Sequence, residues 1–182
     1  TSAGAAVGGF IGYNVSKRHQ LAVGARRVDW FDVPLWQWLS QEQFVIDRLG
    51  ETADLVTIVH PHTRGAYGPD DLRRLTRYHL LEIVNGPFRS EEPWDIALSS
   101  GHPVWAVGND DTHDTTDPRR MAAAWTMIDA PSAASHEIVA GLKAGRSYAV
   151  ARNGDTPVSA DLSLDGVEVV DDTLRVATHG AP

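Results

Sequence analysis

Two stretches of the sequence carry side chains that commonly bind divalent metals. One is His60-Pro-His-Thr-Arg64 and the other is Gly108-Asn-Asp-Asp-Thr-His-Asp114, and each directly follows an apolar run. Asp111 and His113 are two residues apart, so in an extended segment their side chains point to the same side. Imidazole together with carboxylate suits Zn, Mn or Fe rather than Ca, which prefers oxygen ligands alone. Such ions activate water and stabilise charge on a phosphoryl oxygen, so the pattern favours hydrolytic chemistry.

A simpler interpretation stands beside the metal interpretation. Asp and Asn in a loop after a strand often bond only their own backbone, and we interpret Asn109 and Asp110 in this way. A single histidine at a strand end is also commonly a hydrogen-bonded loop residue. A metal site is favoured because two strand ends each present a histidine and one of them adds a carboxylate. A further histidine, His19, stands just before the short apolar run Leu21-Ala-Val23.

The elements that must position these side chains are short apolar runs that alternate with amphipathic segments. This alternation predicts a parallel sheet or barrel with helices outside, whose ligand site lies at the carboxyl ends of the strands. After Gly145 the helices stop, so we divide the chain into an α/β unit at 1–145 and a β-rich C-terminal appendage at 146–182. Ser132 is expected to cap the last helix, and Asp165-Gly166 to form a hairpin turn. The expected strands are 21–23, 54–59, 80–84, 103–107, 122–128, 146–150, 158–164, 167–170 and 173–177, and the expected helices are 35–49, one that begins at Pro69, 90–98 and 132–144.

The composition excludes several functional classes. A chain of 182 residues with 42% hydrophobic and 22% charged residues is ordinary for a globular protein with a buried core. Its net charge of −8 argues against a nucleic-acid partner, which requires a basic face. The absence of cysteine excludes disulfides, thiolate metal sites and cysteine nucleophiles, and it fits a cytoplasmic protein. No apolar run approaches the roughly 20 residues that cross a bilayer, so no membrane partner is expected.

At these motifs the sequence resembles the PHP superfamily (polymerase and histidinol phosphatase type). Val59-His-Pro61 matches the family's His-Pro after a strand, and Asp111-Thr-His113 matches its Asp-x-His. The resemblance spans residues 10–150 and keeps the family's order of motifs. Further elements that resemble the family are Leu81-Glu-Ile-Val-Asn85, Trp94-Asp95 and Ala140-Gly-Leu-Lys-Ala-Gly-Arg-Ser-Tyr148.

The resemblance implies a fold, a ligand set and an activity. The fold would be a distorted βα barrel, here a partial one, that holds two or three divalent ions (Mn, Zn or Fe). His60, Asp111 and His113 would be metal ligands, and His19 would be a fourth. Arg64 would bind phosphate, because its planar guanidinium suits that group. The implied activity is metal-dependent hydrolysis of a phosphoester in a phosphorylated small-molecule substrate.

Two departures from the family pattern bear on this expectation. The family's opening His-x-His and Asp-His motifs do not occur before residue 14, and Asn14 stands where the family has a bridging Glu. Asparagine lacks the negative charge that helps hold two cations together. We therefore expect the chain to be a fragment that lacks the first metal-binding motifs. The open sheet edge of such a partial barrel would favour self-association.

Alternatives to this activity follow from the same residues. The chain could be a catalytically inactive domain derived from that fold, which binds a ligand or a partner, and Asn14 favours this interpretation. A second chain could complete the site. A third alternative is hydrolysis of an amide or an ester, since a fold does not fix the reaction. Among the remaining polar and aromatic residues, we interpret Asp114 and His62 as solvated loop residues, and Tyr67 and Trp105 as packing residues.

Overall fold

The chain forms two compact units, Thr1–Ala151 and Arg152–Pro182. The computed structural model describes residues 6–7, 18–28, 37–63, 66–117, 120–152 and 163–179. The sequence places the boundary after Gly145, whereas in the structure β8 (Ser147–Ala151) pairs with β7 (Ala124–Ile128) inside the first unit.

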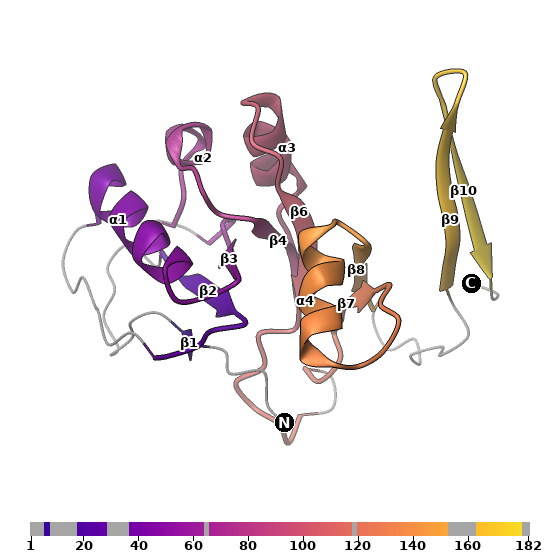
Figure 1. Ribbon diagram of the computed structural model, residues 1–182, viewed down its shortest axis with the longest axis horizontal. Helices are drawn as coiled ribbons and strands as arrows, with labels where there is room; N and C mark the ends of the chain where they lie inside the picture. The colour runs from indigo at the N-terminus through magenta and orange to yellow at the C-terminus, as the bar shows by residue number, and fades with distance from the viewer. Residues whose placement is uncertain are drawn as a thin grey trace. The chain divides into compact units, whose positions relative to one another are not determined.

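A six-stranded mixed sheet is the centre of the first unit (Figure 1). Its parallel part consists of β3, β4 and β6, with β4 between the other two. The short strands β1 and β2 extend the sheet beyond β3 in antiparallel pairing, and β5 folds back on the end of β4. The strands are β1 (Ala6–Val7), β2 (Gln20–Val23), β3 (Leu55–Ile58), β4 (Leu80–Asn85), β5 (Phe88–Arg89) and β6 (Trp105–Asn109).

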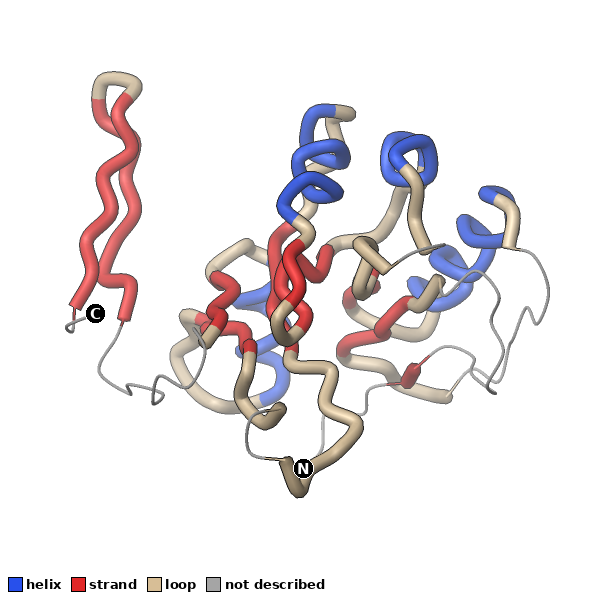
Figure 2. Tube along the Cα trace, turned by 180° about the vertical axis from the view of Figure 1, so that it is seen from behind, coloured by secondary structure: helices blue, strands red, loops and turns tan. Residues whose placement is uncertain are grey.

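Helices cover both faces of this sheet, because alternate residues of its buried strands point to opposite sides. Val56, Ile58 and Leu81 share one hydrophobic core with residues of α1, α2 and α3. Leu55 and Leu80 belong to a second, smaller core with residues of α4. Accordingly, α4 lies in front of the strands in Figure 1 and behind them in the opposite view of Figure 2. The helices are α1 (Leu39–Gly50), α2 (Pro69–Arg74), α3 (Glu91–Ser99) and α4 (Ser135–Lys143).

Most of the elements expected from the sequence are confirmed, whereas the expected strand 158–164 lies mostly outside the described residues and two local predictions are wrong. The helix α4 begins after Ala134, and Ser132 only accepts a hydrogen bond from the Ala134 backbone N–H at 3.3 Å. Asp165-Gly166 lies inside β9 instead of forming a turn. The hairpin turn is Asp171-Asp172, with φ angles of 48° and 59°. Positive φ at both central residues is what a two-residue turn between twisted strands requires, and Asp tolerates it.

The partial βα barrel, and with it the TIM-like architecture, is wrong. In such a barrel each strand runs parallel to its neighbours and the sheet closes on itself. Here β2 runs antiparallel to β3, β7 and β8 form a separate antiparallel pair, and the described strands form no closed sheet. The expected alternation of strands and helices holds for the segment β3-α2-β4-α3-β6, in which the three strands are parallel. This alternation does not determine the direction of a flanking strand such as β2. The prediction of a barrel failed for that reason.

Gly108 allows the β7–β8 pair to pack directly against β6. Its N–H donates to Thr126 Oγ1 at 2.9 Å, and the same hydroxyl donates to the Gly108 carbonyl at 2.8 Å. A Cβ at this position would lie only 2.9 Å from the Trp125 carbonyl oxygen and 3.2 Å from Ala149 Cβ. The glycine therefore fixes how closely the second sheet approaches the strand that leads to Asp111.

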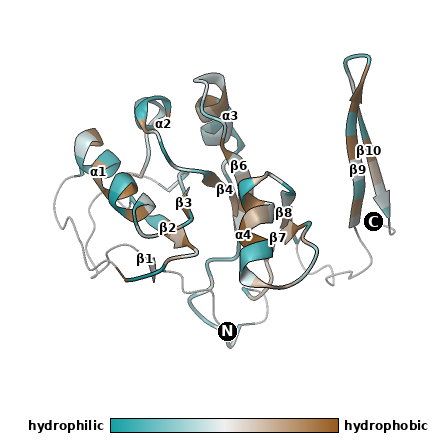
Figure 3. Ribbon diagram, in the orientation of Figure 1, coloured by the Kyte–Doolittle hydropathy of each residue, from teal (hydrophilic) through white to brown (hydrophobic). Residues whose placement is uncertain are grey.

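The second unit contains the antiparallel hairpin of β9 (Ser163–Val170) and β10 (Thr173–His179). The cross-strand pairs Val167–Val176 and Val169–Leu174 give it an apolar face, which has brown strand segments in Figure 3. In the first unit, brown marks β4 and β6, whereas α1 alternates between brown and teal, as expected for a helix with one buried face. Among the described helices, none combines the length and the apolar content that a bilayer crossing requires.

Candidate metal centre

The topology brings His19 and His60 to the same edge of the sheet. The strands β3, β4 and β6 are parallel, so their carboxyl ends share this edge. The strand β2 runs the other way, and its first residue, Gln20, pairs with Ile58 at the end of β3. His19 just precedes β2 and His60 closely follows β3, so the antiparallel pairing places the two histidines beside each other.

The imidazoles of His19 and His60 are in direct contact. His19 Nδ1 lies 2.9 Å from His60 Nε2, and the rings meet edge to face with centroids 4.7 Å apart. Burial lowers the pKa of His19, as does the neighbouring His60, while the carboxylate of Asp111 acts in the opposite direction. A lowered pKa favours the neutral imidazole, which is the form that binds metals.

Asp111 and His113 both lie at the surface, and 45% of the Asp111 side chain is exposed. The Asp111 carboxylate acts electrostatically on His19, His62 and Glu82. The His113 side chain is 76% exposed, and its Nδ1–H donates to the Asp111 carbonyl oxygen at 2.7 Å. This bond leaves Nε2 as the acceptor nitrogen, a tautomer that is common among metal-binding histidines.

The backbones of His60 and Asp111 both adopt the left-handed conformation, with φ angles of 34° and 49°. This region is uncommon for residues other than glycine. Residues held there carry strain, and they cluster at active sites and ligand clamps. His60 is the less usual of the two, because Asp adopts this region readily, as Asp171 and Asp172 do in the hairpin turn.

The chemistry of the donor set fits a divalent transition metal, since imidazole and carboxylate suit Zn, Mn and Fe. His19 and His60 are in contact, and the negative charge of Asp111 acts on His19. Within the part of the chain that the structure describes, no group of three histidine or carboxylate side chains is placed to hold an ion. The described residues therefore supply the ligand types without forming a closed ligand set.

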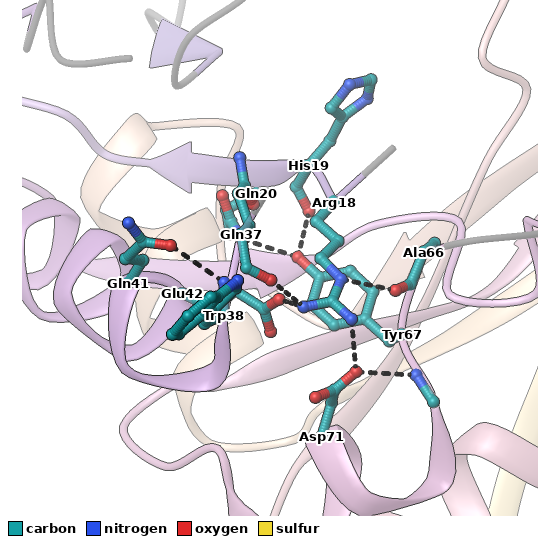
Figure 4. Close-up of polar contacts among 11 residues, drawn as sticks. Arg18, His19, Gln20, Gln37, Trp38, Gln41, Glu42, Ala66, Tyr67 and Asp71 are labelled. Atoms are coloured by element: carbon teal, nitrogen blue, oxygen red, sulfur yellow. Dashed lines mark hydrogen bonds and ion pairs between the residues drawn. The ribbon is translucent and has the colours of Figure 1, made fainter. Parts of the chain in front are cut away.

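A buried ionic cluster anchors the backbone next to His19 (Figure 4). The guanidinium of Arg18 points into this cluster, and the ring of His19 points away from it. Arg18 pairs with the fully buried Glu42 and with Asp71 at 2.9 Å. It also donates to the carbonyl oxygens of Ala66 at 2.7 Å and Gln37 at 2.5 Å.

Tyr67 fixes the same segment from its other side. Its hydroxyl donates to the His19 carbonyl at 2.9 Å and accepts from Gln20 Nε2 at 2.6 Å. Burial raises the pKa of Tyr67, so its hydroxyl keeps the proton that it donates. Tyr67 packs in the core, as the sequence suggests, and it also holds the backbone of a candidate ligand.

Of the other residues that the sequence singles out, Asp114 and Asp110 lie in the loop around Asp111. Arg64 and Asn14 lie outside the described residues. Asp114 is exposed and accepts hydrogen bonds from Thr116 N at 2.9 Å and Thr116 Oγ1 at 2.6 Å, which lower the pKa of its carboxyl. The Asp110 carboxylate accepts from the Ala122 N–H at 2.9 Å. Both acidic side chains therefore serve the local geometry of the loop.

His62 and Trp105 are held by specific contacts. His62 Nδ1 lies 3.0 Å from Ser90 Oγ, and the ring stacks on Phe88 with centroids 4.9 Å apart. These two contacts hold the ring of His62 in place, whereas the sequence suggested a solvated loop residue. Trp105 donates through Nε1 to the Lys143 carbonyl at 3.2 Å, and with 43% of its surface exposed it is only partly packed.

Glu82 is the residue of this edge that the sequence-based reasoning missed. It lies in β4 with 2% of its surface exposed. Burial raises the pKa of Glu82, and hydrogen bonds from Asn109, His60 and Asn85 oppose that rise. A single charged residue inside the apolar run Leu80–Val84 was the available signal. Asn109, interpreted from the sequence as loop geometry, is a partner of this carboxylate.

Comparisons of the chain with protein-family models, with curated proteins and with solved structures find no match. The PHP superfamily therefore stays a prediction from the motifs, and the function has to be argued from the geometry of this edge.

Proposed function

We propose that the edge formed by the ends of β3, β4 and β6 binds a divalent transition metal and that the chain uses this metal to hydrolyse a phosphoester. The observation that carries the proposal is the 2.9 Å contact between His19 Nδ1 and His60 Nε2 beside the charge of Asp111. An ion held there would act as a Lewis acid and make water a better nucleophile at neutral pH.

The residues of the chain have separate tasks in this proposal. His19 and His60 offer neutral imidazole nitrogens, and Asp111 offers a carboxylate that neutralises positive charge. His113 Nε2 is the acceptor nitrogen of its ring and is the fourth candidate ligand. The choice of a phosphoester rests on the family resemblance and on Arg64, and a cytoplasmic location stays a prediction from composition.

Hydrolysis of p-nitrophenyl phosphate and of bis(p-nitrophenyl) phosphate tests this function. We expect activity that is lost after treatment with a chelator and regained with Mn²⁺, Zn²⁺ or Fe²⁺. His60→Ala should abolish it, whereas His136→Ala should not, because His136 is exposed on α4 with 82% of its side chain accessible. Activity that survives complete removal of metal would contradict the proposal.

A non-catalytic binding domain is the second candidate. It is favoured by the lack of a three-ligand group among the described residues. Metal binding without hydrolysis of either phosphoester, or of p-nitrophenyl acetate as an ester probe, would support this candidate over the enzyme. Hydrolysis of the acetate alone would instead identify an esterase.

A further inference from the structure

Glu82 is a buried carboxylate whose contacts connect three segments of the metal edge. Its Oε2 accepts from the backbone N–H of His60 at 2.6 Å and from Asn85 Nδ2 at 3.0 Å. Its Oε1 accepts from Asn109 Nδ2 at 2.7 Å. The donors come from the loop after β3, from the end of β4 and from the end of β6, so one side chain joins the ends of all three parallel strands.

The hydrogen bond from the His60 N–H to Glu82 is made while the backbone of His60 is in a strained conformation. His60 has a φ angle of 34°, a conformation that residues other than glycine hold only where their surroundings enforce it. In this conformation its N–H donates to the carboxylate of Glu82 over 2.6 Å, a short charge-assisted hydrogen bond. Loss of the acceptor would leave a polar group without its partner next to the buried strands, which is costly.

We propose that Glu82 is a positioning residue that sets the backbone of His60, and through it the imidazole that faces His19. The inference deepens the proposed function and rests on it where it concerns metal affinity. Glu82 acts through His60 instead of touching the metal, because the contacts given for its two oxygens are all to N–H donors of the protein. Outer partners of this kind contribute about 10- to 100-fold to metal affinity.

The donor and acceptor pattern around Glu82 provides a specific test. In Glu82→Gln, a neutral amide replaces the carboxylate, so the His60 N–H loses its charged acceptor and the Asn109 amide has to turn over to accept from the new NH2 group. We therefore expect Zn²⁺ to bind about 10- to 100-fold more weakly in calorimetric titration. The double substitution Glu82→Gln with Asn109→Asp restores a complementary pattern, because the introduced amide can donate to the introduced carboxylate and accept from His60. This double variant should regain most of the affinity.

The backbone amide of His60 gives a readout that needs no metal. Its proton should resonate far downfield in the NMR spectrum of the metal-free protein, move upfield in Glu82→Gln and return part of the way in the double variant, where a neutral amide oxygen accepts from it. Leu72→Ala is the control for a general loss of stability, because Leu72 is buried in α2 and is not among the hydrogen-bond partners of Glu82. It should leave both the amide signal and the affinity unchanged. If Glu82→Gln does not fold, Glu82→Asp shortens the side chain by one methylene, which withdraws the carboxylate from the His60 N–H and should shift the amide and the affinity in the same direction.

The outcomes separate this inference from the proposed function. If the unaltered protein binds no Zn²⁺, the proposed function fails, while the amide of His60 still tests the positioning role. If Glu82→Gln leaves the amide and the affinity unchanged, the positioning role is contradicted. If it abolishes binding while the amide of His60 stays in place, Glu82 is itself a ligand and the inference is wrong.

Discussion

Replacing Arg18 with methionine is expected to destabilise the first unit by about 3–5 kcal/mol, as for other buried ion pairs that lose one partner. The side chain of Arg18 is 17% exposed, and it is paired with the fully buried Glu42 and with Asp71. Methionine fills a similar volume but leaves both carboxylates without their cation. The backbone carbonyls of Ala66 and Gln37 lose a donor as well.

Urea unfolding followed by circular dichroism measures this loss. The matched control is Arg73→Met, which removes the exposed pair between Arg73 and Asp70, whose side chains are 52% and 89% exposed. Exposed pairs contribute about 0–1 kcal/mol, so the control should unfold almost as the unaltered protein does. Arg18→Lys should fall between them, because an ammonium cannot reach all four acceptors at once. Equal midpoints for Arg18→Met and Arg73→Met would show that the cluster does not stabilise the fold.

Replacing Asp111 with asparagine is expected to weaken Zn²⁺ binding by more than about 100-fold. Even the outer partners of metal ligands contribute about 10- to 100-fold, and Asp111 is the only carboxylate among the proposed ligands. The substitution keeps the size of the side chain and tolerates the left-handed backbone, since Asn and Asp both adopt it readily. The effect should therefore come from the lost charge and not from a rearranged loop.

Asp114→Asn is the matched control for Asp111→Asn. Asp114 lies in the same loop, is exposed, and bonds only to Thr116 in the contacts that the structure gives. Calorimetric titration should show almost the same Zn²⁺ affinity for this variant and for the unaltered protein. An equal loss in both variants would mean that the loop attracts cations in general, and the assignment of Asp111 would fail.

Local structure was largely predictable from the sequence. The apolar runs that became β3 and β4 are almost continuous because both faces of these strands are buried, and that pattern is visible in the sequence. Pro69 begins α2, as Pro at the first position of a helix often does. The direction of β2 was not predictable, because the sequence of a strand of only four residues does not indicate whether it pairs in the parallel or the antiparallel direction.

The sequence named His19 and His60 as ligands of one metal site, but it predicted neither their direct contact nor the topology that produces it. The sequence put both residues in a barrel, whereas the start of an antiparallel β2 brings His19 to the end of β3. Glu82 and Arg18 escaped prediction for a different reason. The role of a buried charge depends on its partners, and these lie far along the chain: Asn109 for Glu82, and Asp71 for Arg18.

The most direct test of a metal site at this edge is the ¹⁵N NMR spectrum of the histidine rings during a Zn²⁺ titration. We predict that the ring nitrogens of His19 and His60 shift together as the first equivalent of Zn²⁺ is added. The rings of His102, which contacts the Arg73 carbonyl, and of the exposed His136 should stay unchanged at that point. Unchanged signals from His19 and His60, or shifts that appear first at His136, would contradict the account.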